Sequence, residues 1–285
     1  MYKIGWFSSG RDKAAFDLLL AVHKAIENNY IKNARIRYLF INREYGESSK
    51  SDALFELASK LGIEVICLSS KKFKTDQRLK GLEHSIKLGY DSEELKKWRK
   101  NYDREIINRL NKKESDLNVL AGYMLIFSNF MVQHHVFINL HPALPGGPQG
   151  TWQKVIWTLI KVKAEKAGCM IHLVTEELDR GPPITYCTFS IRGGKFDALW
   201  NDLEHQLQST PFDTIMKKEY ETHPLFQAIR EEEAVREAPL LIETIRLFSK
   251  KKLLIKNKDV FMDCEKIEGG LSLTEPVERY LKVTS

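Results

Sequence analysis

The residues of this sequence best suited to chemistry are an asparagine and a histidine, two positions apart at the end of an apolar run. The run 137–140 predicts a strand. Because side chains alternate along a strand, Asn139 and His141 leave the same face of it. Pro142 then directs the chain out of the sheet. We therefore expect both side chains to lie side by side at a strand end, where open α/β sheets bind ligands.

These residue types suit stabilisation of a developing negative charge. The Asn139 amide can donate to an oxyanion, and His141 can hold or release a proton near neutral pH. Asp179 ends another strand-like run, and a carboxylate near a histidine orients the ring and favours its charged form. Neither Ser nor Cys stands between Asn139 and His141, so this segment lacks the nucleophile of a serine or cysteine hydrolase. Each residue alone would suit a cap, a core position or a turn, whereas the set at strand ends favours a site.

Three segments of the chain resemble those of the folate-dependent formyltransferase family. The family carries Asn-x-His-Pro-Ser-Leu-Leu-Pro, and this sequence has Asn139-Leu-His-Pro-Ala-Leu-Pro145. The family motif Leu-Ala-Gly-(Phe/Tyr)-Met matches 120–124, and its motif Val-Thr-x-Glu-Leu-Asp-x-Gly-Pro matches 174–182. The motifs keep the family's order and similar spacing. The similarity extends over nearly the whole chain, with insertions near 71–90 and 209–228.

The resemblance implies an enzyme of one-carbon metabolism, closest to the branch that formylates glycinamide ribonucleotide in purine biosynthesis. Such a transferase moves the formyl group of 10-formyltetrahydrofolate, its co-substrate, to a primary amine, and it needs no metal. Asn139 and protonated His141 would stabilise the tetrahedral oxyanion, while Asp179 would hold the histidine and manage the amine's proton. Two alternatives stay open. One is a different amine, such as an amino sugar nucleotide, and the other is a catalytically silent folate- or nucleotide-binding protein.

The resemblance also implies which residues bind the two substrates. The expected folate contacts are Met124, Leu125, Ile126, Val174, Thr175, Glu176 and Glu177. The turn of Gly10, Arg11, Asp12 and Lys13 would bind the anionic end of the amine, because free N–H groups at a helix start favour anions. In this turn Arg11-Asp12-Lys13 replaces the family's Ser and Asn donors, and an ordinary strand-to-helix turn is the other interpretation.

Composition argues against several classes of protein. The chain has 285 residues, 43% hydrophobic and 29% charged, which is typical of a globular protein. No apolar run reaches the roughly 20 residues of a membrane span, and 1–7 predicts a strand rather than a signal peptide. The four cysteines lack the spacing of a zinc site and suit a reducing compartment. We therefore expect a cytoplasmic protein with no membrane partner.

The charge of the chain bears on its partners. A net charge of +6 suits a phosphorylated small-molecule amine. The basic residues do not form the concentrated stripe that a nucleic-acid partner requires, so none is expected. A homodimer stays open.

The pattern of elements predicts an α/β fold. We expect an open, mostly parallel twisted sheet with helices on both faces, of the Rossmann-like formyltransferase type, and a short C-terminal hairpin. Strands are predicted over 1–7, 34–42, 63–68, 117–121, 137–140, 168–175 and 183–191, helices over 13–30, 51–61, 71–90, 92–110, 152–162, 193–208 and 234–249, and the hairpin over 253–262. We expect one domain over 1–285, with a nucleotide- and phosphate-binding half at 1–118 and a folate-binding and catalytic half at 119–285. The last residues of the chain are expected to form a weakly ordered tail.

Overall fold

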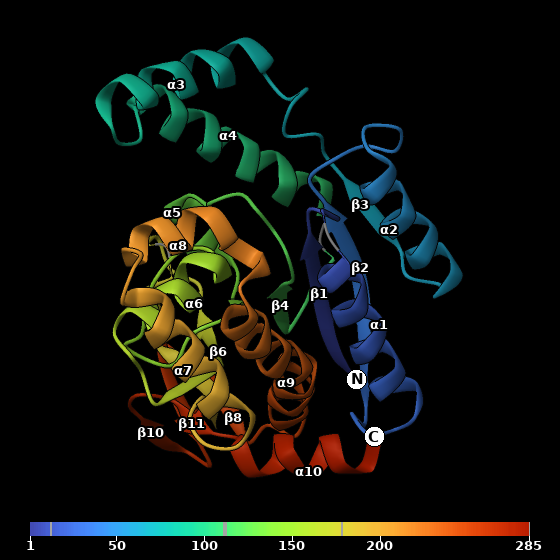
Figure 1. Cartoon of the computed structure of the whole chain (residues 1–285). Helices are drawn as coiled ribbons and strands as arrows, with labels where there is room; N and C mark the ends of the chain where they lie inside the picture. Colours follow the sequence, from blue (N-terminus) through green and yellow to red (C-terminus); the bar gives the residue numbers. More distant parts are fainter. Residues whose placement is uncertain (12, 111–112, 178, 285) are drawn as a thin grey trace. The chain divides into compact units, whose positions relative to one another are not determined.

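The computed structural model describes residues 1–284 except residues 12, 111–112 and 178 (Figure 1). The chain folds into two compact units. The first unit holds residues 1–139 and 173–181, and the second holds residues 140–172 and 182–285.

The strands form an eight-stranded sheet in the order β11-β7-β6-β5-β4-β1-β2-β3. Its members are β1 (Tyr2–Ser8), β2 (Ala34–Ile41), β3 (Val65–Cys67), β4 (Leu117–Leu120), β5 (Phe137–His141), β6 (Lys166–Leu173), β7 (Pro183–Ser190) and β11 (Leu271–Ser272). The pairs β1–β2, β1–β4, β2–β3, β4–β5 and β7–β11 are parallel, and β6–β7 is antiparallel. The α/β fold with a mostly parallel sheet flanked by helices is confirmed.

Helices connect the parallel strands of the first unit, as parallel crossovers require. They are α1 (Lys13–Glu27), α2 (Ser49–Lys60), α3 (Thr75–Leu88), α4 (Glu93–Leu110) and α5 (Asn129–His134). The predicted helix over 71–90 is confirmed as α3, which packs antiparallel against α4 (Figure 1). The two backbones approach so closely that a Cβ on Gly81 would lie 2.8 Å from the Leu95 nitrogen. Glycine at this position therefore permits the tight helical hairpin.

An aromatic core of the first unit gathers around the last residues of β1 and β2 and the first residue of β5. Phe7, the next-to-last residue of β1, packs its ring 5.0 Å from Phe137 of β5 and 5.2 Å from Phe40 of β2. Tyr123 and Phe127, from the segment after β4, add their rings to the same cluster. This core therefore supports the segment in which folate contacts are expected.

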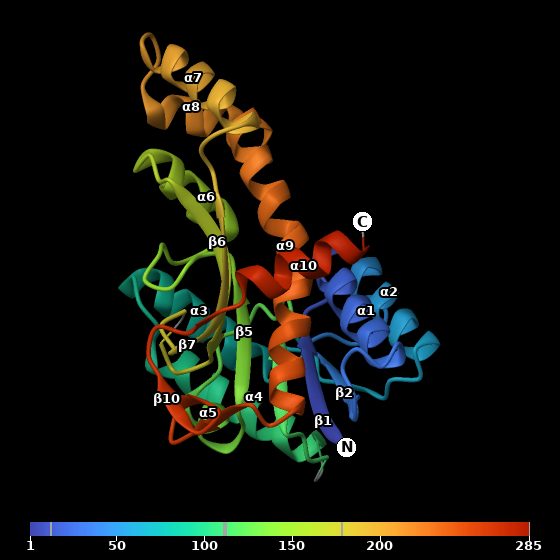
Figure 2. The same ribbon diagram turned by 90° about the horizontal axis from the view of Figure 1, so that it is seen from below.

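The second unit contains the whole of the chain's second insertion, 209–228. Its elements outside the large sheet are α6 (Trp152–Lys161), α7 (Lys195–Leu207), α8 (Phe212–Glu219), the 3-10 helix η1 (Tyr220–Thr222), α9 (Pro224–Ser249), α10 (Thr274–Thr284) and the three-stranded sheet β8 (Leu253–Lys256), β9 (Asp259–Met262) and β10 (Glu265–Ile267). Figure 2 shows α7 and α8 at the N-terminal end of α9. Of the helices that the structure describes, none has the length and apolar character of a membrane span.

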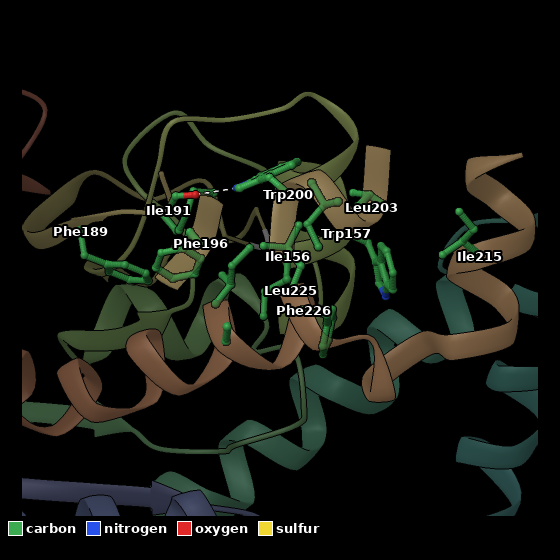
Figure 3. Close-up of a cluster of buried hydrophobic side chains, with 14 residues drawn as sticks. Ile156, Trp157, Phe189, Ile191, Phe196, Trp200, Leu203, Ile215, Leu225 and Phe226 are labelled. Carbon is green, nitrogen blue, oxygen red and sulfur yellow. Dashed lines mark hydrogen bonds between the residues drawn. The ribbon is translucent and has the colours of Figure 1, made fainter. Parts of the chain in front are cut away.

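A separate hydrophobic core holds α6, α7, α8 and the start of α9 together (Figure 3). Trp157 of α6, Leu203 of α7 and Ile215 of α8 pack in it with residues from the start of α9. The Trp200 indole N–H donates to the carbonyl of Ile191 at 2.6 Å, which ties α7 to the end of β7. The insertion is therefore a packed helical layer of the second unit.

The expected weakly ordered tail is wrong. After the hairpin the chain forms β10, β11 and α10, and Val277 of α10 is fully buried. Arg236 of α9 donates to Glu278 of α10 at 2.7 Å. Tertiary packing and this ion pair stabilise a helix of only 11 residues, whose own sequence is too short for a stable isolated helix.

The last strand of the large sheet is short and lies beside β7. Leu271 and Ser272 pair with Thr185 and Tyr186. The N–H of Leu273 then donates to the carbonyl of Tyr186 at 2.8 Å. This strand occupies the position next to β7 at one edge of the sheet.

Candidate active site

The turn after β1 is built from two buried serines and a glycine. The N–H of Gly10 donates to Ser8 Oγ at 3.1 Å. Gly10 has a φ of +57°, and a Cβ there would lie 3.0 Å from the Ser51 Cα, so both the conformation and the space favour glycine. Arg11 is exposed, and Lys13 begins α1 with its Nζ 3.4 Å from Asp17. Asp12, expected to bind substrate, lies outside the described residues.

The segment 122–128 continues from β4 as irregular chain with bends at Gly122 and Leu125. Tyr123 and Phe127 pack into the aromatic core, and Leu125 is partly buried against it. Met124 and Ile126, between them, are 55% and 37% exposed. Buried or half-buried side chains thus alternate with exposed ones from Tyr123 to Phe127. Two of the three expected folate contacts in this segment therefore present apolar side chains outward.

Hydrogen bonds hold both ends of this segment. At its start, the N–H of Ser9 donates to the carbonyl of Gly122 at 3.1 Å, and the N–H of Met124 donates to Ser9 Oγ at 2.9 Å. At its end, the backbone N–H and the hydroxyl of Ser128 donate to Asp103 Oδ2 at 2.6 and 2.5 Å. The Ser9 contacts connect this segment directly to the turn of Gly10.

Burial of Asp103, only 2% exposed, raises the pKa of its carboxyl from 3.8 to about 7, against the opposing hydrogen bonds from Ser128. Between these pH values the folded protein keeps a proton that the unfolded chain has released. The free energy of unfolding therefore falls as the pH rises toward 7, by about 1 kcal/mol per pH unit.

We expect Asp103→Asn to remove this dependence, because an amide does not titrate. Urea unfolding of both proteins at pH 5, 6 and 7 measures it. The wild type should lose stability relative to the variant with each step, and parallel profiles would contradict the raised pKa.

The loop 173–181 belongs to the first unit. Its start is fixed by the N–H of Val174, which donates to the carbonyl of Phe137 at 2.8 Å. The Thr175 hydroxyl donates to the carbonyl of Glu177 at 3.2 Å. Asp179 has a φ of +54°, a left-handed conformation that Asn and Asp tolerate better than most residues. The loop conformation thus gives a structural reason for an aspartate at position 179, in addition to its expected catalytic role.

A cavity of about 580 Å³ lies within the first unit. Its apolar lining includes Ile126, Phe127 and Phe130. Its polar lining comprises Asp91, Lys96, Arg99, Lys100, Ser128, Asn129, Gln133 and Glu176. The structure thus brings together Ile126 and Glu176, two of the expected folate contacts. The volume is typical of small-molecule sites.

The end of β5 carries Asn139 and His141. Asn139 pairs in register with Leu120 of β4. His141 is 3% exposed, and its Nε2 lies 3.0 Å from the carbonyl oxygen of Pro148. Because a carbonyl can only accept, Nε2 carries the hydrogen of this bond. The His141 ring also lies perpendicular to that of His172, with centroids 6.1 Å apart.

The prediction from sequence overlooked two residues of these arrangements. Ser9 links the Gly10 turn to Met124, and its position directly after β1 and before a glycine was a usable signal. His172 packs against His141 and, like it, stands near the end of a buried strand. The joint action of Asn139, His141 and Asp179 stays a prediction.

The sequence profile of the formyl transferase family matches residues 41–195 of the chain. A phosphoribosylglycinamide formyltransferase of Saccharomyces cerevisiae is 31% identical over 121 residues, which cover 38% of this chain and 56% of the yeast protein. One of Dictyostelium discoideum is 29% identical over 178 residues, which cover 58% of this chain and 74% of that protein. The matched part of this chain thus spans little more than half the length of the yeast relative.

A solved structure shares the fold. The phosphoribosylglycinamide formyltransferase of Coxiella burnetii superimposes with a TM-score of 0.64 at 19% identity, covering 95% of this chain and 98% of that one. The sheet and helices described above are therefore those of a known architecture.

Proposed function

Because the chain belongs to the formyl transferase family, we propose that it transfers the formyl group of 10-formyltetrahydrofolate to the primary amine of glycinamide ribonucleotide. The observation that carries this proposal is the end of β5. There the sequence Asn139-Leu-His141-Pro places an amide donor and a buried imidazole on one face of a strand, directly before the chain leaves the sheet. The named relatives support glycinamide ribonucleotide as the acceptor.

In this proposal the residues at the end of β5 stabilise charge rather than attack the substrate. The amine nitrogen forms a bond to the formyl carbon while the carbonyl oxygen becomes negative. Asn139 donates to that oxygen through its amide, and His141 donates in its protonated form. The bond to the folate nitrogen then breaks, and this nitrogen takes up a proton.

Asp179 accepts a proton of the attacking amine, directly or through a water, in the same proposal. His172 is a positioning residue, since its ring packs edge-on against that of His141. The hydrogen bond from Nε2 to the Pro148 carbonyl fixes the His141 ring as well. Together these two contacts hold the imidazole in one orientation, so it can donate to the oxyanion without a change of rotamer.

We assign the cavity of the first unit to the folate. Its apolar wall at Ile126 and Phe127 suits the aromatic part of that molecule. Lys96 and Lys100 of α4 line the same cavity and suit the carboxylates of the glutamate end, and the Lys96 ammonium also pairs with Glu93 at 2.7 Å. Arg99 is less available, because both terminal nitrogens of its guanidinium donate to Asp91.

A different phosphorylated or sugar-linked amine is the second candidate, and the turn of Gly10 favours it. The N–H of Gly10 already donates to Ser8 Oγ. An anion bound here would therefore depend on Arg11, Lys13 and the first turn of α1 rather than on this backbone donor.

The test is a substrate panel with purified protein and 10-formyltetrahydrofolate. Loss of the formyl group is followed with glycinamide ribonucleotide, with glycinamide, with an amino sugar nucleotide and without amine. Turnover with glycinamide ribonucleotide and much slower turnover with glycinamide support the proposal. Turnover with another amine alone would replace the acceptor, and folate binding without any turnover would favour a catalytically silent binding protein.

A further inference from the structure

We propose that Ser9 and Asp103 are positioning residues that hold the two ends of the segment 122–128 and thereby set the affinity for the folate. The inference rests on the proposed function, because this segment is the one expected to line the folate site. It adds two residues that contact neither substrate in the proposal. Both act through the backbone and hydroxyl of residues within the segment.

The segment needs anchors because its own backbone forms neither helix nor strand between β4 and α5. Fixing a residue of free chain costs conformational entropy. A ligand that had to order several such residues would therefore bind more weakly, whereas a segment that is already ordered avoids this loss. Met124 and Ile126 can present their exposed side chains to a ligand only if the backbone on either side is held.

Ser9 holds the start with a contact that few residue types could supply. Its backbone N–H donates to the Gly122 carbonyl, which any residue but proline could do. Its hydroxyl accepts from the Met124 N–H at 2.9 Å, which requires a short polar side chain. Ser9 is 1% exposed, so water cannot readily replace the hydroxyl.

Asp103 holds the far end. A single oxygen, Oδ2, accepts from both the N–H and the hydroxyl of Ser128, which is also the residue before α5. Asp103 lies in α4, next to Tyr102, whose hydroxyl donates to the Leu68 carbonyl at 2.6 Å. The far anchor is therefore part of a helix that is itself tied to the chain after β3.

The two anchors can be removed separately. Ser9→Ala removes the acceptor of the Met124 N–H, and Ser128→Ala removes one of the two bonds to Asp103 while leaving that buried carboxyl in place. Asp103→Ala removes both bonds, and Asp103→Asn keeps an acceptor for at least one of them. Ser85→Ala is the matched control, because its hydroxyl donates to the Gly81 carbonyl within the α3–α4 hairpin, away from the segment.

Two kinds of measurement are made on each variant. Hydrogen exchange of the Met124 and Ser128 amides in the free protein reports the anchors, and calorimetric titration with 10-formyltetrahydrofolate, together with kcat, reports their effect. We expect Ser9→Ala to speed exchange of the Met124 amide and to raise the Kd about five- to tenfold, with kcat within about threefold of wild type. Asp103→Ala should weaken binding more than Ser128→Ala, and Asp103→Asn should restore part of the loss.

The outcomes separate this inference from the proposed function. A wild type that neither binds the folate nor transfers its formyl group defeats the proposed function. An active wild type whose Ser9→Ala and Asp103→Ala variants keep the same Kd overturns the anchoring alone. A loss of kcat at constant Kd also overturns it, because the effect would then lie in the chemistry. A Kd shift as large in Ser85→Ala would mean a general loss of stability.

Discussion

Replacement of His141 by alanine is expected to lower kcat by about 100-fold or more, the size typical of a positioned acid or base. The KM for both substrates should change far less, because the proposed role of His141 is to stabilise charge that develops only in the transition state. Steady-state kinetics with 10-formyltetrahydrofolate and a saturating amine measures both quantities.

The variant must be shown to fold, since His141 is almost fully buried and donates to the Pro148 carbonyl. Leaving that carbonyl unpaired costs about 1–3 kcal/mol. His141→Asn supplies an amide N–H that can donate to the Pro148 carbonyl in place of the imidazole. The rate should therefore fall in this variant even where stability recovers. His205→Ala, at an exposed position of α7, is the control for loss of a histidine. A near-normal rate in both His141 variants would exclude a catalytic role.

Reversal of charge at Arg11 and Lys13 is expected to raise the KM for a phosphorylated amine by about tenfold or more, or about 1.4 kcal/mol. Both side chains stand at the start of α1, where the helix dipole also favours an anion. The effect should shrink in high salt, since both residues are exposed and their charges are screened. The KM for 10-formyltetrahydrofolate should hardly change.

Lys24→Glu is the matched control for Lys13→Glu. It makes the same charge change on the same helix, in its last turn and at an exposed position. The separation of 11 residues places it about 16 Å along the helix axis. If Lys24→Glu raises the KM as much as Lys13→Glu, the effect is one of net charge, and the turn of Gly10 is not an anion site.

Local rules were enough to predict much of the fold. The turn of the hairpin between β8 and β9 is an example, because Asn257 and Lys258 adopt φ values of 52° and 67°, as a two-residue hairpin turn requires. The N-cap of α6 is local as well, because the Thr151 side chain accepts from the Lys154 N–H. Both features depend on a few neighbouring residues.

The start of α9 shows where such rules fail. The helix was predicted from residue 234 but begins at Pro224, ten residues earlier. The run Arg-Glu-Glu-Glu at 230–233 breaks the apolar periodicity, so it is typical of a solvated face. In the structure Glu233 is fully buried and pairs with Arg230 at 3.0 Å. Because these charged residues pair with each other inside the protein, the sequence pattern did not indicate that this stretch of helix faces the core.

The candidate site divides in the same way. The common face of Asn139 and His141 follows from strand alternation and needed no structure. The contact of Ser9 with Met124 joins positions 115 apart, and the contact of Asp103 with Ser128 joins positions 25 apart. Neither contact produces a periodic pattern in the sequence, because each depends on a single hydrogen-bonding side chain. Residues that hold the site were therefore harder to predict than those expected to perform the chemistry.

Beside β7, the two-residue strand β11 has a protective consequence. A strand at the margin of a sheet exposes unpaired N–H and C=O groups, which invite pairing with another chain. By bonding along 185–186, β11 satisfies part of that margin, and Thr274 Oγ1 accepts the next free N–H, that of Thr188, at 3.1 Å. A chain that ended before Leu271 would keep β7 but leave the N–H and C=O groups of its outer edge unpaired. Such a truncation would be prone to self-association, although it would keep every residue of the candidate site.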